Sequence, residues 1–147
     1  MIAVVQRVSE ARVVVSGATV GEIGPGLLAL VAVQVDDTAE DVKWMAGKLT
    51  TLRIFRNGEK HFDVDVQQSG GSMLLVSNFT VAGKTKQGRR PSFDAAAKPD
   101  VGRKLFDELV SAVKSLGIMT ATGEFGADMT VSLVNDGPST FIVNSKE

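Results

Sequence analysis

The chain has 147 residues, a formal net charge of −1 and no cysteine. The length suits one domain, here residues 1–147, and the charge excludes a globally basic nucleic-acid binder while leaving room for a local basic patch. The missing cysteine excludes disulfides and thiolate chemistry, and neither a membrane span nor a signal peptide is recognisable, which is compatible with a cytoplasmic protein.

The N-terminal third of the chain predicts β-strands. Apolar runs are separated by Ser16-Gly17 and by Gly24-Pro25-Gly26, which favour turns. The expected strands are residues 2–8, 11–15, 19–23 and 27–35.

A helix is predicted next. Thr38 suits the N-cap, and Asp41 three residues later makes a weaker form of the capping box. Apolar residues then recur at helical spacing, namely Val42, Met45, Ala46 and Leu49.

A second helix is expected to begin near Pro99, which suits the first helical position, and to stop at Gly117. Its apolar face comprises Val101, Leu105, Leu109, Val113 and Leu116. Further strands are predicted at residues 72–79, 130–134 and 140–143. The order of elements indicates an α/β (mixed α+β) fold, in which a mixed, mainly antiparallel sheet has two helices over one face.

The segment Asn135-Asp136-Gly137-Pro138-Ser139-Thr140 lies between the last two apolar runs, so it predicts a turn between strands. Proline removes a backbone donor and fixes one φ angle, and a preceding glycine relieves the steric restriction that proline imposes. The expected product is a stiff corner whose carbonyl oxygens are free to meet a ligand.

Familiar catalytic groups are scarce in this chain. The lone histidine, His61, is the only candidate base for a Ser/His/Asp arrangement, and a solvated loop histidine is the simpler interpretation. A zinc site would have His61 as its only nitrogen ligand, and neither Gly70-Gly71 nor Gly24-Pro25-Gly26 has the pattern of a phosphate-binding loop. Asp63 and Asp65 could form a carboxylate pair, and alternation on a loop or edge strand is the simpler interpretation. We expect no metal and no cofactor.

Two other stretches carry candidate function. Ser77-Asn78-Phe79-Thr80 ends a buried strand with hydroxyls, an amide and backbone N–H groups, although an ordinary strand end explains it as well. Residues 84–90, named the basic loop here, hold four cations suited to phosphate contacts, or else form a solvated surface: Lys84, Lys86, Arg89 and Arg90.

Ordered sequence blocks extend over essentially the whole chain. They are residues 1–8 with the core Val-Gln-Arg-Val, Gly21-Glu22-Ile23-Gly24, Leu52-Arg53-Ile54-Phe55, Ser77-Asn78-Phe79-Thr80, Gly88-Arg89-Arg90-Pro91-Ser92-Phe93 with Ala95-Ala96-Ala97, Gly123-Glu124-Phe125-Gly126-Ala127-Asp128-Met129, and Ser132-Leu133-Val134-Asn135-Asp136-Gly137-Pro138. In this order they resemble the D-aminoacyl-tRNA deacylase family, also called D-tyrosyl-tRNA deacylases.

The resemblance implies a cytoplasmic homodimer with that family's fold, which hydrolyses the ester joining a D-amino acid, or glycine, to the 3′ end of tRNA. It implies an active site at the dimer interface, where a cis Gly-Pro motif enters the partner's pocket; the motif falls on Gly137 and Pro138. The family's strand-end motif falls on residues 77–80. No DNA and no membrane is expected as a partner.

The family offers two catalytic schemes, one with the threonine as nucleophile and one that relies on the 2′-hydroxyl of the terminal adenosine. The second is favoured here, because a threonine hydroxyl needs an activating base and none accompanies Thr80. An aminoacyl ester is already activated, so we expect the N–H groups of Phe79 and Thr80 to stabilise an oxyanion while Thr80 positions substrate or water.

The Gly137-Pro138 corner suggests a basis for chiral selection. The Gly137 carbonyl would accept from the substrate ammonium, leaving the Cα hydrogen of a D-residue against rigid backbone, where an L-residue would place its side chain. Glycine has no side chain to reject, so glycyl-tRNA should also be accepted.

Three departures from the family pattern leave other functions open. Asn78 replaces the usual glutamine, Ser139 replaces valine, and Val81-Ala82 replaces a common Leu-Tyr pair. We expect these changes to tune rate or pocket shape. The alternatives are a tRNA-binding module with weak or altered acyl-tRNA proofreading, or a purely structural dimer, which would make no use of the basic loop.

Overall fold

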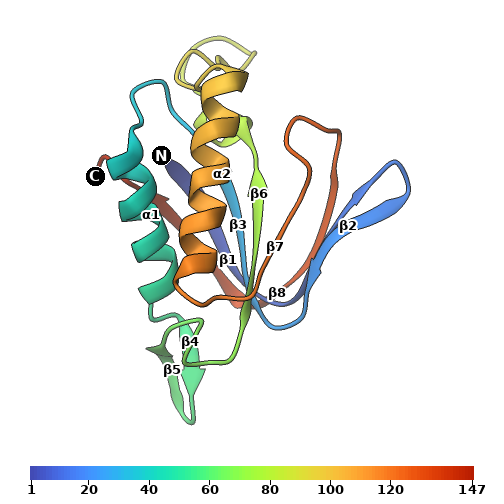
Figure 1. Ribbon diagram of the computed structural model, residues 1–147, viewed down its shortest axis with the longest axis vertical. Helices are drawn as coiled ribbons and strands as arrows, with labels where there is room; N and C mark the ends of the chain where they lie inside the picture. Colours follow the sequence, from blue (N-terminus) through green and yellow to red (C-terminus); the bar gives the residue numbers. More distant parts are fainter.

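The computed structural model describes residues 1–147 (Figure 1). Its elements in chain order are β1 (Ile2–Val15), β2 (Ala18–Ile23), β3 (Gly26–Ala32), α1 (Ala39–Thr51), β4 (Phe55–Asn57), β5 (Lys60–Val64), β6 (Ser72–Ser77), the 3-10 turn η1 (Phe79–Ala82), α2 (Pro99–Ser115), β7 (Thr120–Thr122) and β8 (Thr130–Asn144). No helix combines the length and the apolar character needed to cross a bilayer.

Six strands form one mixed sheet, and a separate two-stranded hairpin joins β4 to β5. The order in the large sheet is β2-β1-β3-β6-β7, and β8 pairs with β1 alone. The pairs made by β1 are antiparallel, while β3 with β6 and β6 with β7 are parallel. The two helices lie side by side against one face of the sheet (Figure 1). The predicted fold class, a mainly antiparallel mixed sheet with two helices, is confirmed.

Both faces of the central strands are buried. Successive residues of β3 and β6 point alternately into two clusters, as the pleat of a strand requires. Leu27 and Leu75 belong to the large cluster beneath the helices, whereas Leu28 and Leu74 belong to a smaller cluster on the opposite face. No helix covers that second face, so the sheet itself must curl over it.

Gly21 marks where the curled sheet closes on itself. A Cβ atom at this position would lie 2.1 Å from the carbonyl oxygen of Thr122. Only glycine permits β2 to approach β7 so closely. This closure was not visible in the sequence, because it depends on two segments about 100 residues apart along the chain.

The helix boundaries agree with the sequence signals. Asp41 accepts a 2.9 Å hydrogen bond from the N–H of Thr38, which completes the predicted capping box of α1. Pro99 is the first residue of α2, and Gly117 follows its end with a φ of +89°.

Several strand boundaries differ from the predictions. Residues 2–8 and 11–15 form the single strand β1, the strand predicted at 27–35 ends at Ala32, and the one predicted at 72–79 ends at Ser77. The strand predicted at 72–79 ends before Phe79 because η1 begins at that residue. β7 and the β4-β5 hairpin were not predicted, since each is short and partly polar.

The prediction of a turn at residues 135–140 is wrong, because the chain does not reverse its direction there. Thr140 pairs with Gln6 and Val134 pairs with Glu10, so both flanks of the segment run antiparallel to the same strand, β1. Residues 135–140 are therefore a bulge within β8 that does not reverse the chain. The prediction failed because glycine and proline next to apolar runs mark bulges as well as turns.

Candidate functional site

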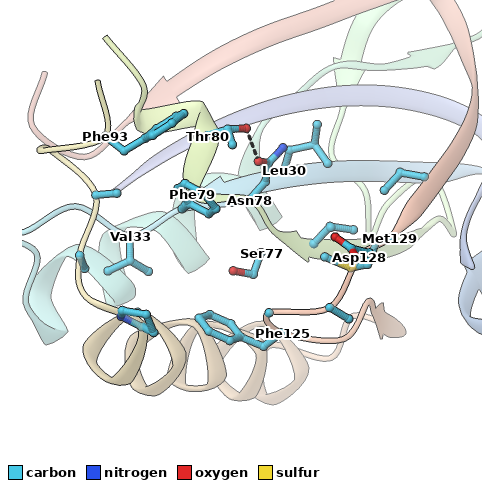
Figure 2. Close-up of a pocket in the computed structure, with 18 of the residues that line it drawn as sticks. Leu30, Val33, Ser77, Asn78, Phe79, Thr80, Phe93, Phe125, Asp128 and Met129 are labelled. Atoms are coloured by element: carbon cyan, nitrogen blue, oxygen red, sulfur yellow. Dashed lines mark hydrogen bonds between the residues drawn. The ribbon is translucent and has the colours of Figure 1, made fainter. Parts of the chain in front are cut away.

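A cavity of about 900 Å³ lies between η1, the start of α2 and the segment that leads into β8 (Figure 2). Its walls are mainly apolar, and its polar groups gather at the end of β6. The lining residues are Leu30, Val33, Val76, Ser77, Asn78, Phe79, Thr80, Phe93, Ala96, Ala97, Pro99, Gly102, Phe125, Gly126, Ala127, Asp128, Met129, Val131 and Leu133. A cavity of this kind, apolar with a few convergent polar groups, is the usual form of a small-molecule site.

The segment Ser77-Asn78-Phe79-Thr80 forms one end of this cavity. The backbone of Asn78 is extended, with φ −146° and ψ 90°, and its N–H donates a 2.8 Å hydrogen bond to the carbonyl of Val31. This bond fixes the point at which β6 changes into η1. All four predicted residues therefore lie together on the cavity wall.

The hydroxyl of Thr80 donates a 2.5 Å hydrogen bond to the side-chain oxygen of Asn78 (Figure 2). An amide oxygen is not a base at neutral pH, so this contact orients the hydroxyl without activating it.

Ionisable groups are nearly absent from the cavity lining. Asp128 is the one lining residue with a titratable side chain, and its side chain is exposed. His61 lies elsewhere, on the exposed strand β5. The interpretation of His61 as a solvated histidine, and not as a catalytic base, therefore agrees with its location outside the cavity.

Asp63 and Asp65 do not form a carboxylate pair with each other. Asp63 accepts a 2.8 Å hydrogen bond from Asn57 and lies 3.3 Å from Arg53. The Asn57 hydrogen bond, with Lys60 and Arg53 nearby, holds the pKa of Asp63 below its ordinary value. No cluster of three or more histidine, cysteine, aspartate or glutamate side chains is arranged to hold a metal ion.

Phe125, Asp128 and Met129 line the cavity, although the sequence had assigned them no role. Phe125 is held from α2: the guanidinium of Arg103 lies 4.7 Å from its ring centroid and donates a 3.4 Å hydrogen bond to its carbonyl. The signal that was available is the pair of glycines, Gly123 and Gly126, around an aromatic residue. It does not by itself reveal a cavity wall.

The basic loop is a hairpin-like extension next to the cavity. Its base is closed by two backbone hydrogen bonds, 2.8 Å from Lys84 N–H to Ser92 and 2.9 Å from Ser92 N–H to Lys84. The four cations of the loop are exposed and form no ion pair within the chain. Their charges are therefore not compensated within the chain.

The Gly137-Pro138 peptide bond is cis and lies outside the cavity of its own chain. Arg7, which is 3 % exposed, donates a 2.8 Å hydrogen bond to the carbonyl of Asp136. On the other side, the amide of Asn135 accepts a 2.7 Å bond from Ser139 N–H and donates a 3.0 Å bond to the Thr140 hydroxyl. The two side chains fix the backbone on both sides of the motif.

Comparison with known proteins identifies the family. The family model described as D-Tyr-tRNA(Tyr) deacylase matches residues 4–144. A D-aminoacyl-tRNA deacylase of Geobacter sulfurreducens is 53 % identical over 146 residues, which is 99 % of this chain and 96 % of that protein. One from Thermosipho africanus is 47 % identical over 147 residues, which is 100 % of this chain and 99 % of that protein.

Solved structures agree with this result. The structure titled c-Myc DNA Unwinding Element Binding Protein has a TM-score of 0.94 and 31 % identity, covering 98 % of each chain. A probable eukaryotic D-amino acid tRNA deacylase has a TM-score of 0.82 over 97 % of this chain and 98 % of its own; at 19 % identity it supports the fold alone. The family match, the high identity over the full length and the shared fold place this chain in the D-Tyr-tRNA(Tyr) deacylase family.

Proposed function

We propose that this protein hydrolyses the ester bond of D-aminoacyl-tRNA and of mischarged glycyl-tRNA, releases the free amino acid and tRNA, and leaves L-aminoacyl-tRNA intact. Membership of the deacylase family supports the reaction class. The observation that carries the proposal is the Ser77–Thr80 segment on the wall of an apolar cavity of about 900 Å³ that no histidine, lysine or arginine lines. Such a site suits a substrate that is already activated.

Catalysis in this site rests on positioning and on charge stabilisation. The Thr80 hydroxyl donates a hydrogen bond to the amide oxygen of Asn78, which is not a base. Thr80 therefore lacks the base that a threonine nucleophile requires. The first N–H groups of a helical turn have no partner within the turn, which makes those of Phe79 and Thr80 available to a developing oxyanion. The attacking group would be water or the 2′-hydroxyl of the terminal adenosine, held in place by Ser77, Asn78 and Thr80.

Selection against L-amino acids is assigned to Gly137 and Pro138 of a second copy of the chain. Within one chain this motif lies outside the cavity, so it reaches a cavity only across an interface. β8 pairs with β1 alone and has exposed apolar side chains at Val134 and Ile142, which favours the pairing of two copies. The active form is then a homodimer.

The remaining roles follow from charge and location. Lys84, Lys86, Arg89 and Arg90 would contact the phosphates near the 3′ end of tRNA, since all four are exposed and unpaired. Residues 1–147 would act as one deacylase unit in the cytoplasm, where aminoacyl-tRNA is used. The proposed reaction uses no cofactor and no DNA.

Deacylation assays with purified protein test this function. We expect hydrolysis of D-tyrosyl-tRNA and glycyl-tRNA above the spontaneous rate measured without protein, and no acceleration with L-tyrosyl-tRNA. Binding of all three without turnover would contradict the hydrolase and support a tRNA-binding module. Equal hydrolysis of the D- and L-esters would contradict the assignment of chiral selection.

A further inference from the structure

The basic loop is inserted between two parts of the cavity wall. The chain leaves the wall at η1, where Gly83 N–H donates a 2.9 Å hydrogen bond to the carbonyl of Thr80. It returns to the wall at Phe93 and continues through Ala96 and Ala97. A change in the conformation of the loop therefore acts on residues that line the cavity.

The two ends of the loop are held differently. The returning segment is tied to the region just after β3 by hydrogen bonds of 3.0 Å from Val35 N–H to Ala95 and 2.9 Å from Ala97 N–H to Val33. The departing end makes one backbone hydrogen bond to the sheet, from Asn78 N–H to Val31, and otherwise only packs against β1 and β3. Movement of the loop is thus expected to affect η1 more than the returning segment.

Phe93 makes the side-chain contact between the two ends. Its ring packs edge-on against Phe79, with centroids 5.1 Å apart and an interplanar angle of 74° (Figure 2). A Cβ atom at Gly83 would lie 3.0 Å from Cε1 of Phe93, so the ring also fills the space over the start of the loop. Phe79 is directly followed by Thr80, whose hydroxyl faces Asn78.

We propose that Phe93 is a positioning residue that couples phosphate binding at the basic loop to the arrangement of Phe79 and Thr80 in the cavity. The inference rests on the proposed function. Four unpaired cations allow the loop to bind a polyanion. The contact between the Phe93 and Phe79 rings then passes the resulting change in loop conformation to η1. The tRNA body then accelerates hydrolysis of its own ester, an effect that a small ester without phosphates does not produce.

A double-mutant cycle tests the coupling. One variant is Phe93→Leu, and the other neutralises the loop with Lys84→Ala, Lys86→Ala, Arg89→Ala and Arg90→Ala together. With the native loop, Phe93→Leu should lower kcat on D-tyrosyl-tRNA about fivefold or more with little change in KM, in the range of ordinary coupling energies. With the neutral loop, the same change should alter kcat less than about twofold. Phe93→Tyr keeps the ring and should retain the native kcat.

An equal loss of kcat from Phe93→Leu in both backgrounds would overturn the inference, because it would show that Phe93 supports η1 regardless of the charges on the loop. A second measurement needs no variant: the wild-type kcat on 3′-(D-tyrosyl)adenosine should be lower than on D-tyrosyl-tRNA by the same factor, and equal values would also overturn the inference. Absence of wild-type hydrolysis of D-tyrosyl-tRNA would instead refute the proposed function itself.

Discussion

The hydroxyl of Thr80 is the residue-scale feature that bears most directly on mechanism. Its proton points to the amide oxygen of Asn78, and no histidine lines the cavity. A threonine nucleophile would need a base to accept that proton. Thr80 is therefore better suited to hold a substrate or a water molecule than to attack the ester.

Replacing Thr80 by valine tests this assignment. Thr80→Val keeps the shape and removes the hydroxyl, so kcat should fall about fivefold, as expected for one neutral hydrogen bond of about 1 kcal/mol. Loss of a nucleophile would cost about 10⁴-fold or more. Single-turnover deacylation of D-tyrosyl-tRNA distinguishes the two results. Thr51→Val is the matched control, since the Thr51 hydroxyl also makes one hydrogen bond, to Gly47, but lies outside the cavity.

Ser139 lies directly after Gly137 and Pro138, the motif proposed to select against L-amino acids and called the proposed selector below. It is 4 % exposed, and its backbone N–H is bound by Asn135. A Cβ atom at Gly137 would lie 2.6 Å from the Ser139 hydroxyl, and Gly137 has a φ of +151°. Position 137 therefore requires glycine, and the backbone at Ser139 is held in the bulge by its hydrogen bond to Asn135.

At the scale of elements, the bulge in β8 is built by β1 as much as by β8 itself. Arg7 of β1 donates to the carbonyls of Asp136 and Ile54, at 2.8 and 2.7 Å, and lies 5.6 Å from the ring centroid of Phe62. One buried guanidinium thus ties the bulge to the segment that precedes β4. The conformation of the Gly137-Pro138 motif, the proposed selector, depends on this contact between distant elements.

Removal of the guanidinium should be costly. Arg7→Met leaves the carbonyls of Asp136, Ile54 and His61 without their donor, and we expect the free energy of unfolding to fall by about 2–3 kcal/mol. Urea denaturation measures this loss, and the ratio of D- to L-tyrosyl-tRNA hydrolysis should fall with it. Arg56→Met is the matched control: Arg56 binds the same Asp136 at 3.0 Å, but its side chain is 46 % exposed, so the loss should stay below about 1 kcal/mol. Equal losses in the two variants would contradict the structural role of Arg7.

At the scale of the whole molecule, the two ends of the chain meet near the start of α1 (Figure 1). The Met1 ammonium forms an ion pair with Asp37 and donates a 2.7 Å hydrogen bond to the Ser145 hydroxyl. That hydroxyl donates at 2.6 Å to Asp41, which also lies 2.9 Å from the ammonium of Lys146. Burial alone would raise the pKa of Asp41, but the hydrogen bonds from Ser145, Lys146 and Thr38 outweigh it and hold that pKa well below its ordinary value.

This cluster predicts a loss of stability in acid. A carboxyl whose pKa is depressed in the folded state stabilises that state above its unfolded pKa of about 3.9 and loses the effect as the pH falls below it. The hydrogen bond to Asp41 raises the pKa of Lys146, so the contribution of Lys146 is present at neutral pH and is lost only in strong base. Asp41→Asn should therefore be less stable than wild type at pH 7, and the difference should narrow towards pH 2.

Urea denaturation at pH 7, 4 and 2 measures the predicted change. Asp107→Asn, which alters an exposed carboxylate on α2 that forms no ion pair, is the control and should follow the wild type at every pH. A constant difference between Asp41→Asn and wild type from pH 7 to pH 2 would contradict the assignment.

The sequence predicted local structure well where one short segment contains the whole signal. The capping box of Thr38 and Asp41, the start of α2 at Pro99 and the location of residues 77–80 at a strand end are of this kind. The predicted turn at residues 135–140 was wrong, because a bulge and a reversal share the same local residues and differ only in how their flanks pair with β1. The sequence also did not reveal that Phe125 and Asp128 line the cavity, because the cavity wall is formed by segments that are distant in the chain.

The helices, most of the strands and the family resemblance followed from the sequence alone, since each depends on residue types and short spacings. The tertiary structure decided the rest: that Arg7 reaches the bulge, that the basic loop returns to the cavity through Phe93, and that Gly137-Pro138 lies outside the cavity of its own chain. These are contacts between segments far apart in the chain. Such contacts are set by strand register and by the curl of the sheet, which no local pattern encodes.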